Sequence, residues 1–238
     1  MKKTIKIFLL TIFSLILLSL FPKVEANSIN SISMDIAIDD NGNASVTEIW
    51  KCKTSQVTEV YHPYYNLGNS EISNLTVSEN GTKYTTLSTW NTSGTLSDKA
   101  YKCGINRLSN GVELCWGIST YGSHTYTIKY NISNFVSELS DSQMIYWTLI
   151  PYDFSNSIGN VYIKIHSNFN IPDSVGVWGY GNYGGTAYVY DGYIEMQSDG
   201  NLATDEYMTI LVQFPLESFN CSNKLDYDFN HYVNMADD

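Results

Sequence analysis

Residues 123–149 read S-H-T-Y-T-I-K-Y-N-I-S-N-F-V-S-E-L-S-D-S-Q-M-I-Y-W-T-L, and this stretch decides the fold class. Over 125–132, apolar and polar residues alternate. Successive side chains of a β-strand point to opposite faces, so this part predicts a strand with one buried and one solvated face. Residues 144–147 are apolar on both faces, which predicts a central strand that is covered on both sides.

Strand-like runs continue on both sides of this stretch, separated by turn signals. D-D-N-G-N at 39–43, E-N-G at 79–81 and D-G at 191–192 each lie between such runs, as hairpin turns do. Pro63 has no amide hydrogen to donate to a β-ladder, so the extended run around it predicts an edge strand or a crossover.

The whole pattern predicts an all-β fold, an antiparallel β-sandwich of the immunoglobulin-like or jelly-roll-like kind. Short strands separated by turns are typical of sandwiches, whereas a parallel sheet alternates its strands with helices. The simplest partition is one domain over residues 27–216. We expect the C-terminal tail, residues 217–238, to be irregular or helical.

The charge balance is strongly acidic. The chain holds 24 acidic and 13 basic residues, which gives a formal net charge of -11, and Arg107 is its only arginine. Binding to nucleic acid or to anionic lipid headgroups requires phosphate groups to be neutralised by clustered basic residues. The sequence has no such cluster, so it predicts neither kind of partner, and its acidity indicates solubility.

The N-terminus carries an export signal. Lys2, Lys3 and Lys6 precede an apolar run over 7–21, and V-E-A at 24–26 is an acceptable cleavage site. The first 26 residues therefore predict a secretory signal peptide, and the mature chain would lie on the extracellular side of the cell membrane or be secreted. An uncleaved N-terminal anchor is the alternative.

Four cysteines suit an exported chain that forms disulfides. Cys103 and Cys115 flank N-R-L-S-N-G and lie opposite each other if the turn is centred on Ser109, but not if it is a tighter Asn-Gly turn. The pairing that we expect is Cys103 with Cys115 and Cys52 with Cys221. No spacing of cysteines and histidines predicts a zinc site.

A glycine-rich, aromatic loop is the candidate ligand site. G-Y-G-N-Y-G at 179–184 has the glycine spacing of a dinucleotide fingerprint, but that fingerprint requires a following helix, and T-A-Y-V-Y at 186–190 is strand-like. We therefore expect a hairpin loop. Its rings Trp178, Tyr180 and Tyr183 form the candidate patch, because aromatic rings on loops stack on sugars or pack on partners.

Signals for catalysis and for metals are weak. Asp39, Asn41 and Asn43 alternate like calcium ligands, but Gly42 in this segment already explains them as a turn. Glu48 and Glu113 lie in strand-like runs and are conceivable catalytic carboxylates, although strand carboxylates usually lie on the solvated face. The sequence therefore predicts no catalytic residue, no metal and no cofactor.

Several stretches together resemble a known family, the YciQ-like predicted bacterial membrane proteins, in their N-terminal domain of unknown function. The resemblance covers most of residues 28–235 and rests on the order and spacing of its motifs. These are I-D-D-N-G-N-A-S-V-T-E-I-W (38–50), H-T-Y-T-I-K-Y-N-I (124–132), D-S-Q-M-I-Y-W (141–147), I-G-N-V-Y-I-K-I (158–165), the glycine-aromatic loop and Y-M-T-I-L-V-Q-F (207–214).

The resemblance implies an extracytoplasmic all-β domain that is followed by transmembrane helices, and it implies no catalytic residue, cofactor or ligand. Association with a membrane would come from a segment beyond Asp238 or from an uncleaved N-terminus. Our first expectation is a non-catalytic domain that binds or senses an envelope protein or a glycan. The alternatives are a secreted carbohydrate-binding module that uses the aromatic patch, and a hydrolase whose site is assembled in space.

Overall fold

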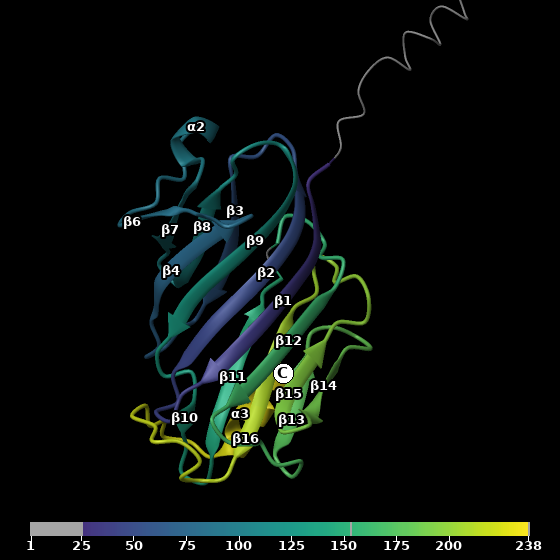
Figure 1. The fold of residues 1–238 in the computed structure, drawn as a ribbon. Coiled ribbons are helices and arrows are strands. Elements are labelled where there is room, and N and C mark those ends of the chain that lie inside the picture. Colours follow the sequence, from purple (N-terminus) through teal and green to yellow (C-terminus); the bar gives the residue numbers. More distant parts are fainter. Residues whose placement is uncertain (1–25, 153, 238) are drawn as a thin grey trace, which may run out of the picture.

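The computed structural model describes residues 26–152 and 154–237, and their regular secondary structure is almost entirely β-strand (Figure 1). The all-β class that the sequence predicts is confirmed. The predicted signal peptide lies outside the described residues, except for Ala26. The two helices among the described residues are short: α2 (Leu96–Lys99), which Thr95 caps, and α3 (Phe229–Asp237) in the predicted tail.

One large sheet forms the front layer in Figure 1, and all its neighbouring strands are antiparallel except β1 and β12. Its eight strands follow the order β14 (Thr186–Tyr190), β15 (Tyr193–Gln197), β12 (Val161–Ser167), β1 (Ser28–Ile38), β2 (Ala44–Thr54), β9 (Gly122–Ile132), β4 (Ile72–Glu79) and β5 (Thr82–Lys83).

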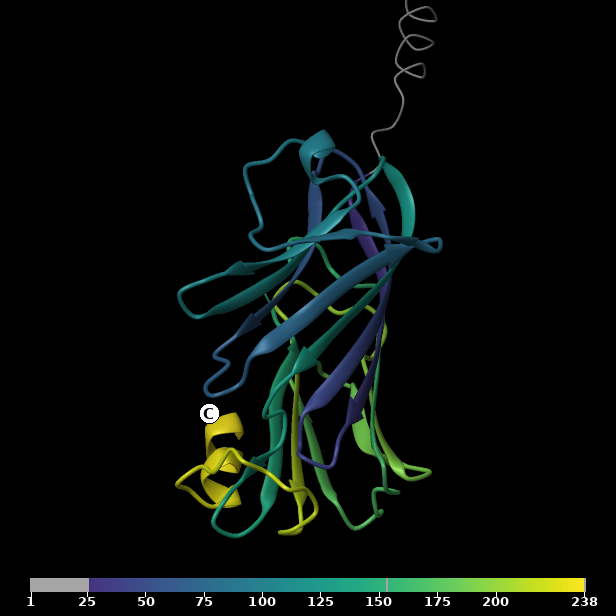
Figure 2. The same cartoon turned by 60° about the vertical axis from the view of Figure 1, so that its left-hand side comes forward.

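Two smaller sheets lie behind the large one (Figures 1 and 2). The first has the order β10 (Ser137–Glu138), β11 (Gln143–Ile150), β16 (Met208–Phe214) and β13 (Gly176–Tyr180). The second has the order β3 (Glu59–Tyr65), β8 (Gly111–Gly117), β7 (Lys102–Arg107) and β6 (Thr85–Leu87), with β6 and β7 parallel. Pro63 lies on β3, which is an edge strand as predicted.

The core fills the space between the large sheet and the two small ones. Strand alternation produces it: the inward apolar residues of β9 are 0–2% exposed, whereas Thr125 and Lys129 are exposed. Trp50 of the large sheet packs edge-to-face on Trp116 of a small sheet, with ring centroids 5.2 Å apart. One continuous apolar cluster thus joins all three sheets.

Strand β11 differs from the central strand that we expected. Its two faces are covered, one by the main core and the other by α3, but β10 pairs with it only at Gln143 and Met144. The rest of β11 therefore has an open edge on the side away from β16. Its Tyr146 packs against Tyr232 of α3, with ring centroids 6.2 Å apart.

The glycine-rich segment is not the hairpin loop that we expected. It joins β13 of a small sheet to β14 of the large sheet, and each of these strands pairs with a different partner. Gly181 has a φ of +96°, and a Cβ atom there would lie 2.4 Å from Tyr207. The loop therefore crosses between layers, and its tight packing against Tyr207 requires glycine.

The expected disulfides are absent, and all four cysteines are free. Cys103 pairs across the ladder with Trp116, and Cys115 pairs with Gly104. The turn is therefore centred between Ser109 and Asn110, and the two thiols point to opposite faces of the sheet. Cys221 approaches Gly42 in the β1–β2 turn. That turn lies about 26 Å along β2 from Cys52, too far for a disulfide.

Candidate functional site

The aromatic residues singled out in the sequence do not form one open patch. Trp178 and Tyr180 lie on β13, and both pack beneath α3. The ring centroids of Trp178 and Phe229 are 5.3 Å apart, and Tyr180 packs on the apolar cluster that contains Phe229. Tyr183 lies in the crossing loop and is 97% exposed. Two of the three rings thus have a packing role.

The residues with calcium-like spacing form a turn. Asp39 Oδ1 accepts hydrogen bonds from the backbone N–H groups of Asn41 and Asn43, both at 2.9 Å. Within the described residues, no three histidine, cysteine or acidic side chains converge in a way that would hold a metal ion. The carboxylate of Asp39 thus accepts hydrogen bonds from the backbone of its own turn.

The two strand carboxylates are not a catalytic pair. Glu113 on β8 accepts a hydrogen bond from Asn106 at 2.6 Å. Glu48 on β2 points into the core, is 0% exposed, and contacts His62 of β3 instead. The sequence contains a signal for the burial of Glu48 that our prediction missed. Val46, Glu48 and Trp50 occupy every second position of β2 and so lie on the same buried face.

Glu48 is the centre of a buried polar cluster that links all three sheets. His62 Nδ1 lies 3.0 Å from both oxygens of Glu48, and His62 Nε2 lies 3.0 Å from the carbonyl oxygen of Leu149 on β11. Tyr130 also donates to Glu48, as does Trp50 Nε1 at 2.5 Å. Both ring nitrogens of His62 face acceptors, so this arrangement suits an imidazolium paired with a carboxylate.

Burial raises the pKa of Glu48, but the charge of His62 and the hydrogen bonds from His62, Tyr130 and Trp50 outweigh it, so the pKa is held below its ordinary value. Burial and the nearby Glu48 raise the pKa of Tyr130 and of Tyr64 well above the ordinary value. The cluster has no exposed side chain through which a substrate could reach it. Its geometry is that of a structural tie between sheets.

A second histidine–carboxylate pair lies farther along the large sheet. His124 Nδ1 is 2.6 Å from Glu79 Oε1, and Tyr84 donates to the other oxygen of Glu79 at 2.9 Å. His124 also faces the carbonyl oxygen of Thr120 at 2.9 Å. Every hydrogen-bonding atom of this pair is thus engaged inside the protein.

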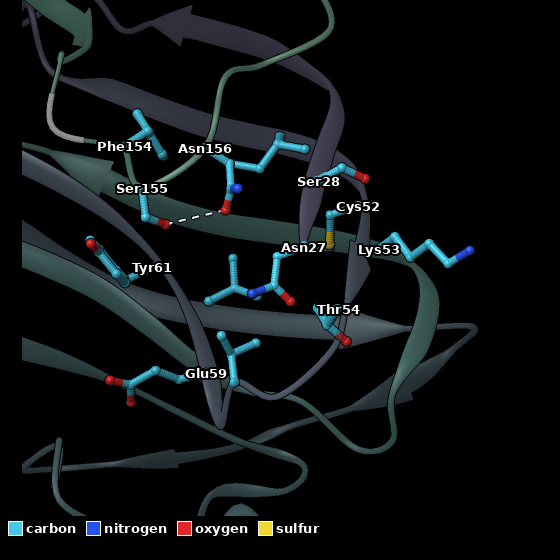
Figure 3. Close-up of a pocket in the computed structure, with 13 residues that line it drawn as sticks. Asn27, Ser28, Cys52, Lys53, Thr54, Glu59, Tyr61, Phe154, Ser155 and Asn156 are labelled. Carbon is cyan, nitrogen blue, oxygen red and sulfur yellow. Dashed lines mark hydrogen bonds between the residues drawn. The ribbon is translucent and has the colours of Figure 1, made fainter. Parts of the chain in front are cut away.

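A small pocket lies beside the first residues of β1 (Figure 3). Its volume is about 60 Å³, and Ile29, Val60 and Phe154 contribute apolar walls. Burial, followed by the negative charge of Glu79, raises the pKa of the Cys52 thiol to about 12. A thiol of that pKa is not a nucleophile at neutral pH, so this pocket has no reactive group at its cysteine.

A larger groove, of about 660 Å³, lies between the β3–β4 loop, the outer side of β11 and the C-terminal segment with α3. In Figure 2 this loop and α3 lie on the same side of the molecule, one above the other. The residues that line the groove are Tyr65, Asn66, Leu67, Gly68, Asn69, Ser70, Asn110, Asn134, Phe135, Ser137, Met144, Tyr146, Trp147, Thr148, Pro151, Tyr152, Tyr207, Asn223, Leu225, Tyr232 and Met235.

The lining of this groove combines aromatic rings with side-chain amides. Seven of the lining residues are aromatic and five are asparagines, and among the described lining residues none is an acid, a histidine, a lysine or an arginine. In a chain with 24 acidic residues this is a marked local exclusion of charge. The groove suits a neutral ligand with apolar faces and many hydrogen-bonding groups.

Hydrogen bonds fix three of the five asparagines that line the groove. Asn69 donates to Asn223 Oδ1 at 3.0 Å, and Asn223 donates to Ser137 Oγ at 2.9 Å. Asn134 donates to the backbone carbonyl of Asn69 at 2.9 Å, which ties the β3–β4 loop to the end of β9. Asn66 has a φ of +54°, a conformation that asparagine adopts more readily than most residues. The side-chain amides of Asn69, Asn134 and Asn223 are thus held in place before any ligand arrives.

Most of the chain matches a known protein family. The family described as "Predicted membrane protein (DUF2207) N-terminal domain" matches residues 28–214. The chain belongs to this family. The match confirms the resemblance inferred from the sequence motifs, and it makes this a DUF2207 domain of a predicted membrane protein. Neither helix in the described part of the chain has the length and apolar character that crossing a membrane requires.

Solved structures resemble the DUF2207 domain in fold alone. Yeast LTA4 hydrolase in complex with bestatin is 8% identical, with a TM-score of 0.50, over 82% of this chain and 30% of that chain. Native leukotriene A4 hydrolase from Saccharomyces cerevisiae is also 8% identical, with a TM-score of 0.48, over 81% of this chain and 30% of its own. The M1 zinc metallopeptidase from Deinococcus radiodurans is 10% identical, with a TM-score of 0.42, over 81% of this chain and 44% of that chain.

This chain thus spans less than a third of the LTA4 hydrolase chains that it matches. No curated protein matches it.

Proposed function

We propose that this DUF2207 domain is a non-catalytic binding module on the outer side of the membrane, and that its groove takes an uncharged glycan. The observation that carries the proposal is the lining of the groove, with its seven aromatic rings, five asparagines and no charged side chain among the described residues. Aromatic faces pack on the apolar faces of sugar rings, and amides both donate to and accept from hydroxyl groups.

A non-catalytic role is supported by the same lining. Glycosidases need two carboxylates that flank the scissile bond, and the described groove residues include no carboxylate. The buried carboxylates Glu48 and Glu79 are engaged by histidines in the core and do not line the groove. An outer-side location is supported by the signal-peptide pattern in the first 26 residues and by the membrane-protein family.

An extended peptide is the second candidate ligand, and the open edge of β11 favours it. Beyond Met144 this strand has no partner on one side, and Tyr146, Trp147 and Thr148 line the groove there. An added strand would pair with such an edge through its main chain. The carbonyl oxygen of Leu149 on this strand already lies 3.0 Å from His62 Nε2, so it is not available to pair with a peptide. Because the available edge is short, we rank the peptide below the glycan.

The test is titration of the full chain with neutral oligosaccharides of hexose and N-acetylhexosamine units, in parallel with uncharged peptides, by calorimetry. We expect Tyr152→Ala and Asn110→Ala to weaken oligosaccharide binding about tenfold each, because both side chains are exposed in the groove. The matched controls are Tyr183→Ala and Asn91→Ala, an exposed tyrosine and an exposed asparagine outside the groove.

Three outcomes contradict the proposal. The first is that no neutral oligosaccharide binds. The second is that Tyr183→Ala weakens binding as much as Tyr152→Ala does, which would return the site to the crossing loop. The third is that uncharged peptides bind and sugars do not, which would assign the groove to the open edge of β11.

A further inference from the structure

The outer face of the large sheet is open to solvent and gathers lysines from four strands. Figure 1 views the molecule from this side, and no other described element lies in front of β1, β2, β9 and β12. Strand alternation turns most of their apolar residues inward and most of their polar residues outward. The outward residues include Lys51 and Lys53 of β2, Lys83 of β5, Lys129 of β9 and Lys164 of β12.

The pairing register aligns two of these lysines across the sheet. Lys164 pairs with Asp35 of β1, Asp35 pairs with Thr47 of β2, and Thr47 pairs with Lys129 of β9. Adjacent strands are about 4.8 Å apart, so Lys164 and Lys129 are separated by about 14 Å across a flat row. Lys51 lies four residues along the ladder from Lys129, about 13 Å away. The lysines therefore spread over the face.

The charge of this face is opposite to that of the chain as a whole. Five outward lysines accompany only two outward carboxylates, Asp35 and Glu195, whereas the chain has 13 basic and 24 acidic residues. Lys51, Lys83 and Lys129 are exposed and form no ion pair with any described residue. The face thus offers positive charge that the protein itself leaves uncompensated.

Both carboxylates on this face are engaged locally. Asp35 lies 3.1 Å from His166 Nε2. Glu195 is 8% exposed and accepts hydrogen bonds from Tyr162 and Tyr188, each at 3.0 Å, and from Gln197 at 2.5 Å. Burial raises the pKa of Glu195, but these bonds outweigh it and hold the pKa below its ordinary value. The acid is therefore charged but largely shielded from a partner.

Tyrosines border the lysines at one side of the face. Tyr188 and Tyr190 of β14 are 41% and 56% exposed, and Lys164 Nζ lies 4.1 Å from the ring centre of Tyr193. Tyrosine is enriched where proteins meet the headgroup layer of a membrane, because its ring is apolar and its hydroxyl is polar. Lysines near an anionic bilayer surface are attracted to it electrostatically.

We propose that this face docks on the anionic phospholipid headgroups of a membrane surface. The occupant is argued from charge complementarity, from the tyrosine border and from the membrane-protein family of the chain. The sequence alone predicted the opposite, because the lysines are far apart in the chain and only strand pairing brings them together. No strand of the large sheet lines the groove, so docking would leave the groove accessible. The proposal is thus independent of the ligand that the groove takes.

The test is flotation of the full chain with phosphatidylcholine vesicles, with and without about one third phosphatidylglycerol. We expect at least tenfold stronger binding to the anionic vesicles, and loss of that preference in the triple variant Lys51→Glu, Lys129→Glu, Lys164→Glu. The matched control is Lys102→Glu, Arg107→Glu, Lys224→Glu, which changes the net charge equally but lies outside the large sheet. We expect it to keep the preference within about twofold.

Two further measurements keep the test decisive. A triple Lys→Gln variant at positions 51, 129 and 164, checked by circular dichroism, avoids introducing new acidic groups. Salt at about 0.5 M shortens the screening length and should abolish the preference of the wild type. The apolar run 7–21 would insert equally into neutral and anionic vesicles. It therefore adds to the binding measured with neutral vesicles and does not change the preference for anionic ones.

The proposal is overturned by equal binding to neutral and anionic vesicles. It is also overturned if both triple variants lose the preference to the same degree, which would indicate an effect of total charge. Binding of soluble poly(glycerol phosphate) without binding to anionic vesicles would assign the face to an anionic polymer and would reject the membrane.

Discussion

At the scale of single residues, Glu48 has the greatest consequence for the fold. It is 0% exposed, and its carboxylate meets donors from β2, β3 and β9, while His62 continues the contact to Leu149 on β11. A buried ion pair contributes little when it is compared with a well-packed apolar replacement, but loss of one partner leaves the other unpaired in the core. Glu48 thus acts as a tie between layers.

We expect Glu48→Gln to lower the free energy of unfolding by about 3 kcal/mol, because it leaves the buried His62 without its counter-charge. The measurement is urea unfolding followed by tryptophan fluorescence at neutral pH. Glu113→Gln is the matched control: this carboxylate also lies on a strand but is partly exposed, so we expect a loss below about 1 kcal/mol. Equal losses in the two variants would contradict a special role for the buried cluster.

The same residue predicts how stability depends on pH. Folding lowers the pKa of Glu48 below its ordinary value of 4.5. Its contribution to stability is therefore complete above the unfolded-state pKa and is lost as the pH falls through the lower folded-state value. We expect the difference in unfolding free energy between wild type and Glu48→Gln to shrink from pH 6 towards about pH 3. A difference that stays constant over this range would show that Glu48 does not titrate as inferred.

At the scale of elements, α3 links the tail to the candidate site. Phe229 is 4% exposed and packs with Leu139, Met144 and Leu211 on the outer side of a small sheet. Tyr232 and Met235, about one and two turns farther along the helix, line the groove. The position of one wall of the groove therefore depends on how firmly this short helix is seated, because a helix of nine residues is marginal without tertiary packing.

We expect Phe229→Ala to speed amide hydrogen exchange in residues 229–237 by at least tenfold while leaving β2 and β9 unchanged, because only the small cluster beneath α3 loses its anchor. Hydrogen exchange with mass spectrometry measures both regions at once. Met235→Ala is the control, since this side chain is 52% exposed. Faster exchange throughout the large sheet would show that α3 is part of the global core and not a locally seated element.

At the scale of the whole molecule, the layers separate three roles. The core between the sheets holds the buried charge clusters, the side with the small sheets holds the neutral groove, and the outer face of the large sheet holds the lysines. A net charge of -11 spread evenly would repel an anionic surface. Five lysines on the outer face of the large sheet would give the domain a preferred orientation towards such a surface, and the groove then lies on the side of the small sheets.

The fold class, the buried face of β9, the edge position of β3 and the family could all be predicted from the sequence. These features follow from local rules: alternation places side chains on one face or the other, proline cannot donate to a ladder, and motifs are read in order along the chain. The alternation of Val46, Glu48 and Trp50 along β2 also indicates that Glu48 is buried, although our prediction placed that carboxylate on the solvated face.

The free cysteines, the groove and the face with the five lysines depend on contacts between distant parts of the chain. The shift of the β7–β8 turn by half a step separates Cys103 from Cys115, and no local pattern specifies that register. The groove combines residues from 65–70, 134–152 and 223–235 with Asn110 and Tyr207. The alignment of Lys164 with Lys129 depends on β1 pairing with β12 across more than a hundred residues. Such contacts depend on which distant strands pair and in which register, and packing of the whole core sets both choices.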